Sequence, residues 1–218
     1  MKDLHCLILL GGKSSRFVDE LGFSKANYKV FDKTWLTWQL EFISRLKIEN
    51  VSLVLGYNYQ DILDLHPFLS INQCISFKKL KVYTYLNQFP EQGSFSSLQL
   101  AIKKIDSNNI LYFPIDVPVL DKKTLENIII SNSNYKVVKC CYQGKGGHPI
   151  LIKGSFLDVI KKADIKKSQL NTLIRNLDKN SVLRLNISDS NVLLNLNYPK
   201  DLKNYISQNI AKFISKKL

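Results

Sequence analysis

The chain has 218 residues, of which 45% are hydrophobic and 22% charged, and its formal net charge is +13. This length and composition can fill one sizeable core, so we expect a single domain over residues 1–218. No apolar run reaches the roughly 18 residues that a membrane span needs, so we expect neither a membrane segment nor a signal peptide. The 4 cysteines show no CxxC spacing, which suggests neither a zinc site nor a disulfide framework and predicts a cytoplasmic protein.

The positive charge would suit a polyanion such as a nucleotide, an acidic surface or a nucleic acid. Most of it comes from lysines scattered along the chain, which are usually solvated, and biased codon usage would give the same pattern. The dense basic stretch at 161–167 looks like a helix face and lacks interleaved aromatic residues for base stacking. We therefore expect small-molecule partners and no nucleic acid, while both a monomer and a homodimer stay open.

Apolar runs bounded by turn residues alternate with amphipathic stretches along the chain. In the first half we expect strands over residues 4–10, 51–55, 82–86 and 110–113, and helices over 35–46, 94–105 and 122–130, the last capped by Asp121. This βαβ order predicts an α/β, Rossmann-like fold with a mostly parallel central sheet flanked by helices. Ligands of such sheets bind where the strands end, so functional residues should lie in the loops that follow the strands.

The second half has a different pattern. We expect strands over 137–141 and 149–152 on either side of a glycine-rich turn, helices over 156–162 and 170–175, and a strand over 182–185. A last helix should begin at Pro199 and carry on one face Leu202, Ile206, Ile210 and Phe213. No repeat, linker or domain boundary is visible in this half.

The loop after the first strand has the residue types of a phosphate site. It reads Leu10-Gly11-Gly12-Lys13-Ser14-Ser15-Arg16, and Lys25 follows. Glycines let backbone amides approach an anion, hydroxyls add donors, and Arg16 and Lys25 supply charge for a triphosphate. The loop is neither a Walker A loop nor the GxGxxG loop of dinucleotide-binding folds. The simpler interpretation is a generic Gly-Gly turn with two surface charges.

A carboxylate follows the strand over 110–113, in the segment Asp116-Val117-Pro118-Val119-Leu120. A carboxylate at a strand end can hold Mg²⁺, a cation that takes one or two protein oxygens together with substrate phosphates. We therefore assign Asp116 as a metal ligand. The alternative is a loop aspartate that caps the next turn.

The phosphate loop resembles the N-terminal signature of the molybdenum cofactor guanylyl- and cytidylyltransferases, which is a strand, then GGxSxRMG, then a lysine. The matching residues are Gly11, Gly12, Ser14, Arg16 and Lys25. Phe17 replaces the methionine, and residues 18–21 lengthen the path to the lysine. The chain is similar to the MobA-like NTP transferase family, and this resemblance implies a GT-A-like nucleotidyltransferase fold.

The same resemblance implies roles for the loop. Arg16 would contact the outer phosphates of the nucleotide, and Lys25 would neutralise charge near the α-phosphate. The other nucleotide-binding residues of the loop would be Leu10, Gly11, Gly12, Ser14 and Ser15.

Two later segments also resemble motifs of this family. Residues 116–120 look like its DxPxL segment, and residues 195–202 look like its NxNTPEDL segment, from which Tyr198 and Lys200 depart. The second segment implies Asn197 as a further Mg²⁺ ligand through its amide oxygen, a weaker ligand than a carboxylate. The alternative is that Asn197 only caps the helix that begins at Pro199.

Residues 92–98 look like the GxxxSL segment of the family, and Gly93 and Ser97 there suit contacts with ribose, base or phosphate. A plain helix cap is the alternative. Residues 144–149 look like the GxxGHP element of the cytidylyltransferase branch, which implies that His148 touches the acceptor. A lone histidine in a tight turn is more often structural.

Together these motifs imply a Mg²⁺-dependent nucleotidyltransferase that moves the monophosphate of an NTP onto a phosphorylated small-molecule acceptor and releases pyrophosphate. An acceptor that is already a phosphate anion needs no strong general base, which agrees with the lack of an obvious Ser/His/Asp arrangement. The start of the loop resembles the guanylyl branch and the GGHP segment the cytidylyl branch, so GTP and CTP both stay open. Molybdopterin is one candidate acceptor, although residues 168–175 depart from the GDxGxR pattern of the cytidylyl branch.

Two other functions stay open. A metal-dependent glycosyltransferase of similar architecture would use a DxD motif, and the segment Asp116-Val117-Pro118 lacks the second aspartate. A non-catalytic nucleotide-binding module would explain the altered phosphate loop and the asparagines at 195 and 197. Magnesium-dependent release of pyrophosphate separates this module from an enzyme.

Overall fold

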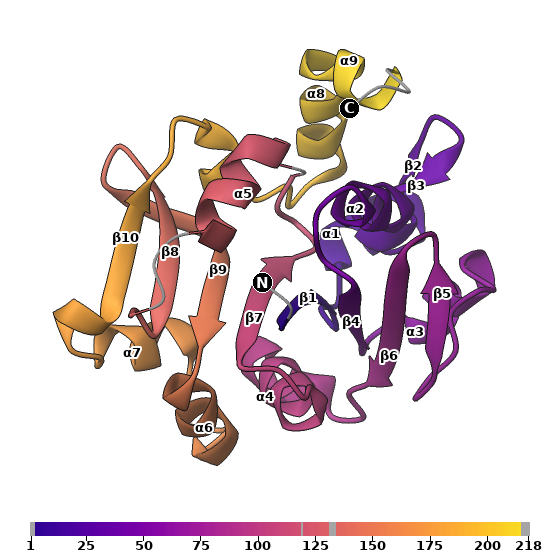
Figure 1. Ribbon diagram of the computed structural model, residues 1–218. Coiled ribbons are helices and arrows are strands. Elements are labelled where there is room, and N and C mark those ends of the chain that lie inside the picture. The colour runs from indigo at the N-terminus through magenta and orange to yellow at the C-terminus, as the bar shows by residue number, and fades with distance from the viewer. Residues whose placement is uncertain (1–2, 119, 131–133, 215–218) are drawn as a thin grey trace.

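The computed structural model describes residues 3–118, 120–130 and 134–214, and Val119 of the DxPxL-like segment lies outside these ranges. Within them, one 8-stranded sheet has the order β10-β8-β9-β7-β1-β4-β6-β5 (Figure 1). Its strands are β1 (Leu4–Leu10), β4 (Asn50–Leu55), β5 (Cys74–Phe77), β6 (Leu80–Leu86), β7 (Asn109–Pro114), β8 (Val137–Tyr142), β9 (Lys145–Lys153) and β10 (Val182–Asn186). A separate ribbon pairs β2 (Lys29–Val30) with β3 (Lys33–Thr34).

The centre of the sheet is parallel, as the sequence predicts. β1 pairs in parallel with both β4 and β7, and β4 pairs in parallel with β6. The carboxyl ends of these four strands therefore meet at one edge of the sheet. The outer strands are mixed: β5 is antiparallel to β6, β9 is antiparallel to β7 and β8, and β10 is parallel to β8.

Helices cover both faces of the sheet, which accounts for the apolar run from Cys6 to Leu10 in β1. Alternate β1 side chains enter two hydrophobic clusters, with Cys6 and Ile8 on one face and Leu7 and Leu9 on the other. The first face packs against α2 (Trp35–Ser44), α3 (Tyr59–Leu65) and α5 (Lys122–Ile130). The second packs against α4 (Ser94–Lys104), α6 (Ser155–Lys162) and α7 (Leu170–Arg175) (Figure 1).

A third hydrophobic cluster joins the N-terminal and C-terminal helices. It packs α1 (Ser15–Leu21) and α2 against α8 (Pro199–Gln208) and α9 (Ile210–Ile214). The expected single last helix is wrong, because a break at Asn209 separates α8 from α9. The break lets Phe213 turn onto the aromatic rings of α2, with its ring centroid 5.2 Å from that of Trp38, while Ile210 is left 47% exposed.

The segment 144–149 is also not the glycine-rich turn that the sequence suggests. The turn between β8 and β9 consists of Gln143 and Gly144, both at positive φ (48° and 75°), as a two-residue hairpin turn requires. β9 begins at Lys145, and Gly146 pairs with Cys141 in the sheet. His148 is therefore a strand residue, which fixes the direction of its side chain.

Four short 3-10 helices complete the described structure: η1 (Lys25–Asn27), η2 (Pro90–Gln92), η3 (Lys179–Ser181) and η4 (Ser190–Leu193). All four cysteines are free thiols. None of the helices in the described ranges is both long and apolar enough to cross a membrane.

Candidate active site

Two cavities lie at the carboxyl ends of β1 and β7. The main cavity has a volume of about 930 Å³, and its lining includes the predicted residues Leu10, Gly12, Ser14, Ser15, Arg16, Lys25, Gly93, Asp116, His148 and Asn197. The side cavity, of about 360 Å³, is lined by Gly11 and Ser97 and shares with the main one Leu9, Gly12, Lys13, Gly93 and Ser94. Residues predicted from segments far apart in sequence thus lie around one connected space.

The two glycines of the phosphate loop have different environments. A Cβ on Gly11 would lie 2.8 Å from Ser97 Oγ, and a Cβ on Gly56 would lie 2.8 Å from Gly11 Cα, because the ends of β1 and β4 and the start of α4 meet there. A Cβ on Gly12 would meet nothing within 4 Å. Gly56 is therefore required for the close approach of β4 to Gly11, a side chain on Gly11 would displace the Ser97 hydroxyl, and Gly12 keeps the space above the loop open.

The extra residues between the loop and Lys25 fold as part of α1. The helix ends at Leu21, and Gly22, at φ 76°, closes it by donating its N–H to Val18 O at 2.8 Å. Arg16 lies in the first turn of α1, with its guanidinium 4.7 Å from the centroid of the Tyr198 ring. Tyr198, which departs from the family motif, thus holds Arg16 at the edge of the main cavity.

Lys25 is a buried cation, with 6% of its surface exposed. It begins η1, and its Nζ lies 5.3 Å from the centroid of the Phe17 ring. Burial lowers the pKa of Lys25 to about 8; Asp116 and Asp201 raise it, and Arg16 lowers it further. None of the ion pairs between described residues includes Lys25, so a ligand anion in the main cavity would compensate its desolvation.

Three consecutive carbonyl groups hold Asp116 in position. Trp35 Nε1 donates to Ile115 O at 2.7 Å, and Gln39 Nε2 donates to Val117 O at 2.9 Å. The carbonyl of Asp116 itself accepts from the backbone N–H of Leu196 at 2.8 Å. Helix α2 therefore fixes the loop after β7, and the last bond joins that loop to residues 195–197.

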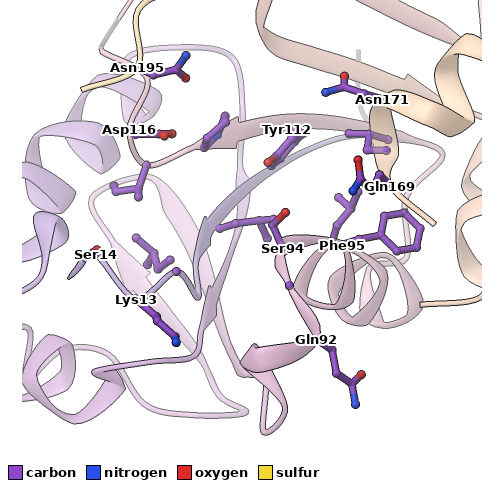
Figure 2. Close-up of a pocket in the computed structure, with 18 of the residues that line it drawn as sticks. Lys13, Ser14, Gln92, Ser94, Phe95, Tyr112, Asp116, Gln169, Asn171 and Asn195 are labelled. Carbon is purple, nitrogen blue, oxygen red and sulfur yellow. The ribbon is translucent and has the colours of Figure 1, made fainter. Parts of the chain in front are cut away.

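Asp116 and Asn197 fit a divalent cation. No hydrogen bond between described residues engages either side chain, and both line the main cavity together with Asn195. Figure 2 shows Asp116 and Asn195 on this side of the cavity. The predicted alternative for Asn197 is wrong, because Tyr198 is the N-cap of α8 and its N–H donates to Asp201 Oδ2 at 3.0 Å. Across the described ranges no three His, Cys, Asp or Glu side chains gather, so a cation here would depend on substrate oxygens, as Mg²⁺ commonly does.

Gly93 and Ser97 lie at the first turn of α4. Gly93 is the N-cap at φ 89°, which favours glycine. Asn87, the residue after β6, donates from Nδ2 to Ser96 Oγ at 2.8 Å and to Ser97 Oγ at 2.9 Å. The first turn of α4 is thus tied to the end of the neighbouring strand, and the backbone at Gly93 lies between the two cavities.

His148 faces the main cavity from β9. Its ring makes an edge contact with Tyr112, with the centroids 5.4 Å apart. Burial lowers the pKa of His148 to about 4, although Asp116 raises it, and burial also raises the pKa of Tyr112. His148 is therefore neutral at pH 7, and its buried Nδ1 has no hydrogen-bond partner among the described residues.

One wall of the main cavity carries no motif that predicts it from the sequence. This wall consists of Ile165, Lys166, Lys167, Ser168, Gln169, Leu170, Asn171 and Thr172, and Figure 2 shows Gln169 and Asn171 across the cavity from Lys13 and Ser14. The expected helix face at 161–167 is wrong in its second half, because α6 ends at Lys162 and Lys166 and Lys167 lie in a turn. Trp35, Gln39, Asn87 and Tyr112 were also missed; an amide directly after a strand was the available signal for Asn87.

Comparison with known proteins decides the family. Residues 6–181 match the MobA-like NTP transferase domain. The chain belongs to this family. The match covers most of the chain, confirms the family resemblance seen in the sequence and ends before the segment 195–202.

Individual relatives agree with this assignment. The 2-phospho-L-lactate guanylyltransferase of Methanocaldococcus jannaschii is 25% identical over 147 residues, which cover 65% of this chain and 62% of that protein. A nucleotidyl transferase from Methanothermobacter superposes with a TM-score of 0.76 at 15% identity, covering 97% of this chain and 100% of that one. Rv0371c from Mycobacterium tuberculosis, crystallised as a complex with manganese, gives 0.69 at 16% identity, covering 94% and 98%. The α/β fold of this MobA-like NTP transferase is that of nucleotidyltransferases.

Proposed function

We propose that this protein transfers the nucleoside monophosphate of an NTP to the phosphate of a small-molecule acceptor and releases pyrophosphate. The observation that carries the proposal is the convergence of Lys25, Arg16 and Asp116 on one cavity beside the phosphate loop. A buried lysine, an arginine and a free carboxylate suit a triphosphate with its metal better than they suit a neutral ligand. We further propose that residues 1–218 act as one domain, in the cytoplasm, as a monomer or homodimer.

Each residue has a role in this proposal. Backbone amides at Gly11, Gly12, Ser14 and Ser15 would hold the phosphates, and Arg16 would hold the leaving pyrophosphate. Lys25 would lie near the α-phosphate, where negative charge builds as the acceptor oxygen attacks. His148, neutral at pH 7, would hydrogen bond the acceptor from the opposite side of the cavity.

We propose Mg²⁺ as the cofactor, held by Asp116 and Asn197. When bound, the ion would neutralise phosphate charge and orient the triphosphate. The fit of the two free side chains supports this assignment, and a distant structural neighbour is a manganese complex.

The side cavity suits the base, with Ser97 and Gly93 beside it. GTP and CTP are both candidates. The named relative is a guanylyltransferase whose acceptor, 2-phospho-L-lactate, is a phosphorylated small molecule. That name supports a phosphorylated acceptor for this chain, and molybdopterin stays a second candidate.

Pyrophosphate release tests the proposal. The protein is incubated with Mg²⁺ and GTP, CTP, ATP or UTP, against 2-phospho-L-lactate, molybdopterin and other phosphomonoesters. We expect release that depends on the acceptor and falls about a hundredfold in Asp116→Asn, which keeps the shape of the side chain and removes its charge. Asp158→Asn, on the exposed side of α6, is the control and should turn over normally. Normal turnover by Asp116→Asn would contradict the role of Asp116, and NTP binding without release for any acceptor would favour a non-catalytic module.

A Gly12→Ala variant separates binding from folding. The new methyl group meets nothing within 4 Å, so we expect the free energy of unfolding to change by less than about 0.5 kcal/mol. The same methyl group would occupy space that the proposed nucleotide needs, so its Kd for NTP should rise about tenfold or more. Denaturant unfolding and calorimetric titration measure the two effects. Unchanged affinity would exclude close approach of the nucleotide at Gly12.

A further inference from the structure

Three cations gather beside the cavity wall formed by residues 165–172. Lys139 on β8 and Arg184 on β10 are direct partners in the sheet, so their side chains leave the same face. Arg175 ends α7 and folds back along it, with Nε donating to Asn171 O at 3.3 Å and Nη2 to Thr172 Oγ1 at 3.4 Å. Lys139 Nζ donates to Asn171 Oδ1 at 3.4 Å. We call Lys139, Arg175 and Arg184 the distal cationic cluster.

The cluster has no carboxylate partner. None of the ion pairs found in the described ranges includes any of its three members. Burial lowers the pKa of Lys139, and the charges of Arg184 and then Arg175 lower it further. Lys139 is the partly buried member and the two arginines are exposed, so an anion bound between them would offset both the desolvation of Lys139 and the repulsion among the three charges.

The local backbone makes room for this arrangement. A Cβ on Gly146 would lie 2.7 Å from Lys139 Cε, so the lysine chain crosses β9 where that strand has no side chain. Arg184 is anchored by a 2.7 Å hydrogen bond from Nη2 to Gly144 O in the β8–β9 turn. Arg184 is thus anchored to the turn, and Lys139 has room to extend across β9 towards Asn171.

The cluster is continuous with the main cavity. Asn171 and Thr172, which contact Lys139 and Arg175, line that cavity. The charge of Lys139 also lowers the pKa of His148, so Lys139 is close enough to interact electrostatically with a side chain that lines the main cavity. Figure 2 shows Asn171 on the opposite side of the cavity from Lys13 and Ser14 of the phosphate loop.

We propose that the distal cationic cluster binds a second anionic group of the acceptor, remote from the phosphate that reacts. This inference rests on the proposed transferase function and narrows its substrate class. The acceptor is a small phosphomonoester whose other end carries a carboxylate or a second phosphate. Asn171 links the bound anion to the cavity, and phosphomonoesters with an uncharged end bind more weakly.

Measuring the affinity of the protein for two phosphomonoesters tests the proposed anion site, and this measurement does not require turnover. The probes are 3-phosphoglycerate, which has a carboxylate at its far end, and glycerol 3-phosphate, which has a hydroxyl there. Their Kd values are measured by calorimetric titration for the wild type, Lys139→Met, Arg175→Gln and the control Arg45→Gln at the end of α2, which lines neither cavity. Two variants are used because Arg175 is exposed and its replacement leaves the core intact.

We expect the wild type and Arg45→Gln to bind 3-phosphoglycerate about tenfold more tightly than glycerol 3-phosphate. Lys139→Met and Arg175→Gln should reduce this ratio to near one. Equal affinities in the wild type, no binding of either probe at millimolar concentration, or a preference that survives both substitutions would overturn the proposal. Pyrophosphate release is scored separately, so binding that depends on Lys139 without any turnover would keep the anion site and reject the transferase.

Discussion

Replacing Lys25 with methionine is expected to stabilise the fold at pH 7 and to abolish most of the activity. The ordinary lysine pKa of 10.5 falls to about 8 because Lys25 is buried, so its charged form destabilises the folded protein. A pKa shift of this size means that burying the charged lysine costs about 3 kcal/mol of folding free energy. The methionine variant avoids this cost, but it loses the contact between the ammonium group and the Phe17 ring, and residual solvent screening already reduces the cost in the wild type. We expect a net gain of about 1–2 kcal/mol in the free energy of unfolding.

The activity should change in the opposite direction. Lys25 lies in the cavity where the proposed α-phosphate accumulates charge, and methionine is an unbranched side chain one atom shorter that lacks the charge. Loss of a preorganised electrostatic contact costs about 100-fold to 1000-fold in kcat. A protein that becomes more stable and less active would separate this lysine from residues that merely pack.

The pH dependence has a defined sign. Below pH 8 Lys25 is charged in both the folded and unfolded states, and the penalty for burying the charge is complete. Between about 8 and 10.5 the unfolded chain binds more protons, so the stability of the wild type should rise with pH in that window. The kcat/KM of the wild type, which reports ionisation of the free enzyme, should fall through the same window as the folded lysine loses its proton.

Denaturant unfolding and steady-state kinetics from pH 7 to 10.5 measure both effects. Lys104→Met is the matched control, because Lys104 also lies over an aromatic ring, 5.4 Å from the Tyr85 centroid, but is exposed at the end of α4. This control should show neither the gain in stability nor the loss of kcat. A Lys25→Met protein that is less stable at pH 7 would contradict the assigned cost of the buried charge.

The centre of the fold was predictable because its physical signals are local. Strand β1 is apolar at consecutive positions from residue 6 to residue 10 since helices cover both faces of the sheet, and that pattern is visible in the sequence. Parallel strands place their carboxyl ends together, so the loop after β1 and Asp116 after β7 had to be neighbours. The convergence of these motif residues on one cavity therefore follows from sequence pattern and topology.

What the sequence could not predict depends on contacts between distant segments. Trp35 and Gln39 look like ordinary helix residues, and only the structure shows them donating to the carbonyls on either side of Asp116. Residues 165–169 of the cavity wall lie in the connection between α6 and α7 and match no motif, so only the structure shows that they line the cavity. The short elements α3 and β5 were missed for the same reason: each is held by packing on α2 and β6 more than by its own pattern.

Gly147 shows how a correct motif can suggest the wrong structure. In the sequence it belongs to a glycine-rich turn, whereas in the fold it lies in β9 beneath η4. A Cβ there would lie 1.9 Å from Val192 O and 2.6 Å from Val192 C, and both are backbone atoms that cannot rotate away. We therefore expect Gly147→Ala to lower the free energy of unfolding by about 3 kcal/mol or more, at the upper end for overpacked cores.

The adjacent glycine is the control. In Gly146→Ala the new methyl group meets only the end of the Lys139 side chain, which can move, so the free energy of unfolding should change by less than about 1 kcal/mol. Denaturant unfolding of the two variants, side by side, measures the difference. Equal stabilities would mean that η4 moves away from β9 without cost.

The consequence of Gly147→Ala should extend to the site. Gly147 precedes His148 on β9, and η4 precedes the segment that carries Asn197 and whose Leu196 N–H bonds Asp116 O. Forcing η4 from β9 would therefore move the proposed acceptor contact and the proposed metal ligands relative to one another. We expect the variant to lose at least tenfold in kcat/KM even at temperatures where it stays folded, because small displacements of positioned groups are costly. Retained activity in a destabilised variant would show that the two sides of the cavity are placed independently.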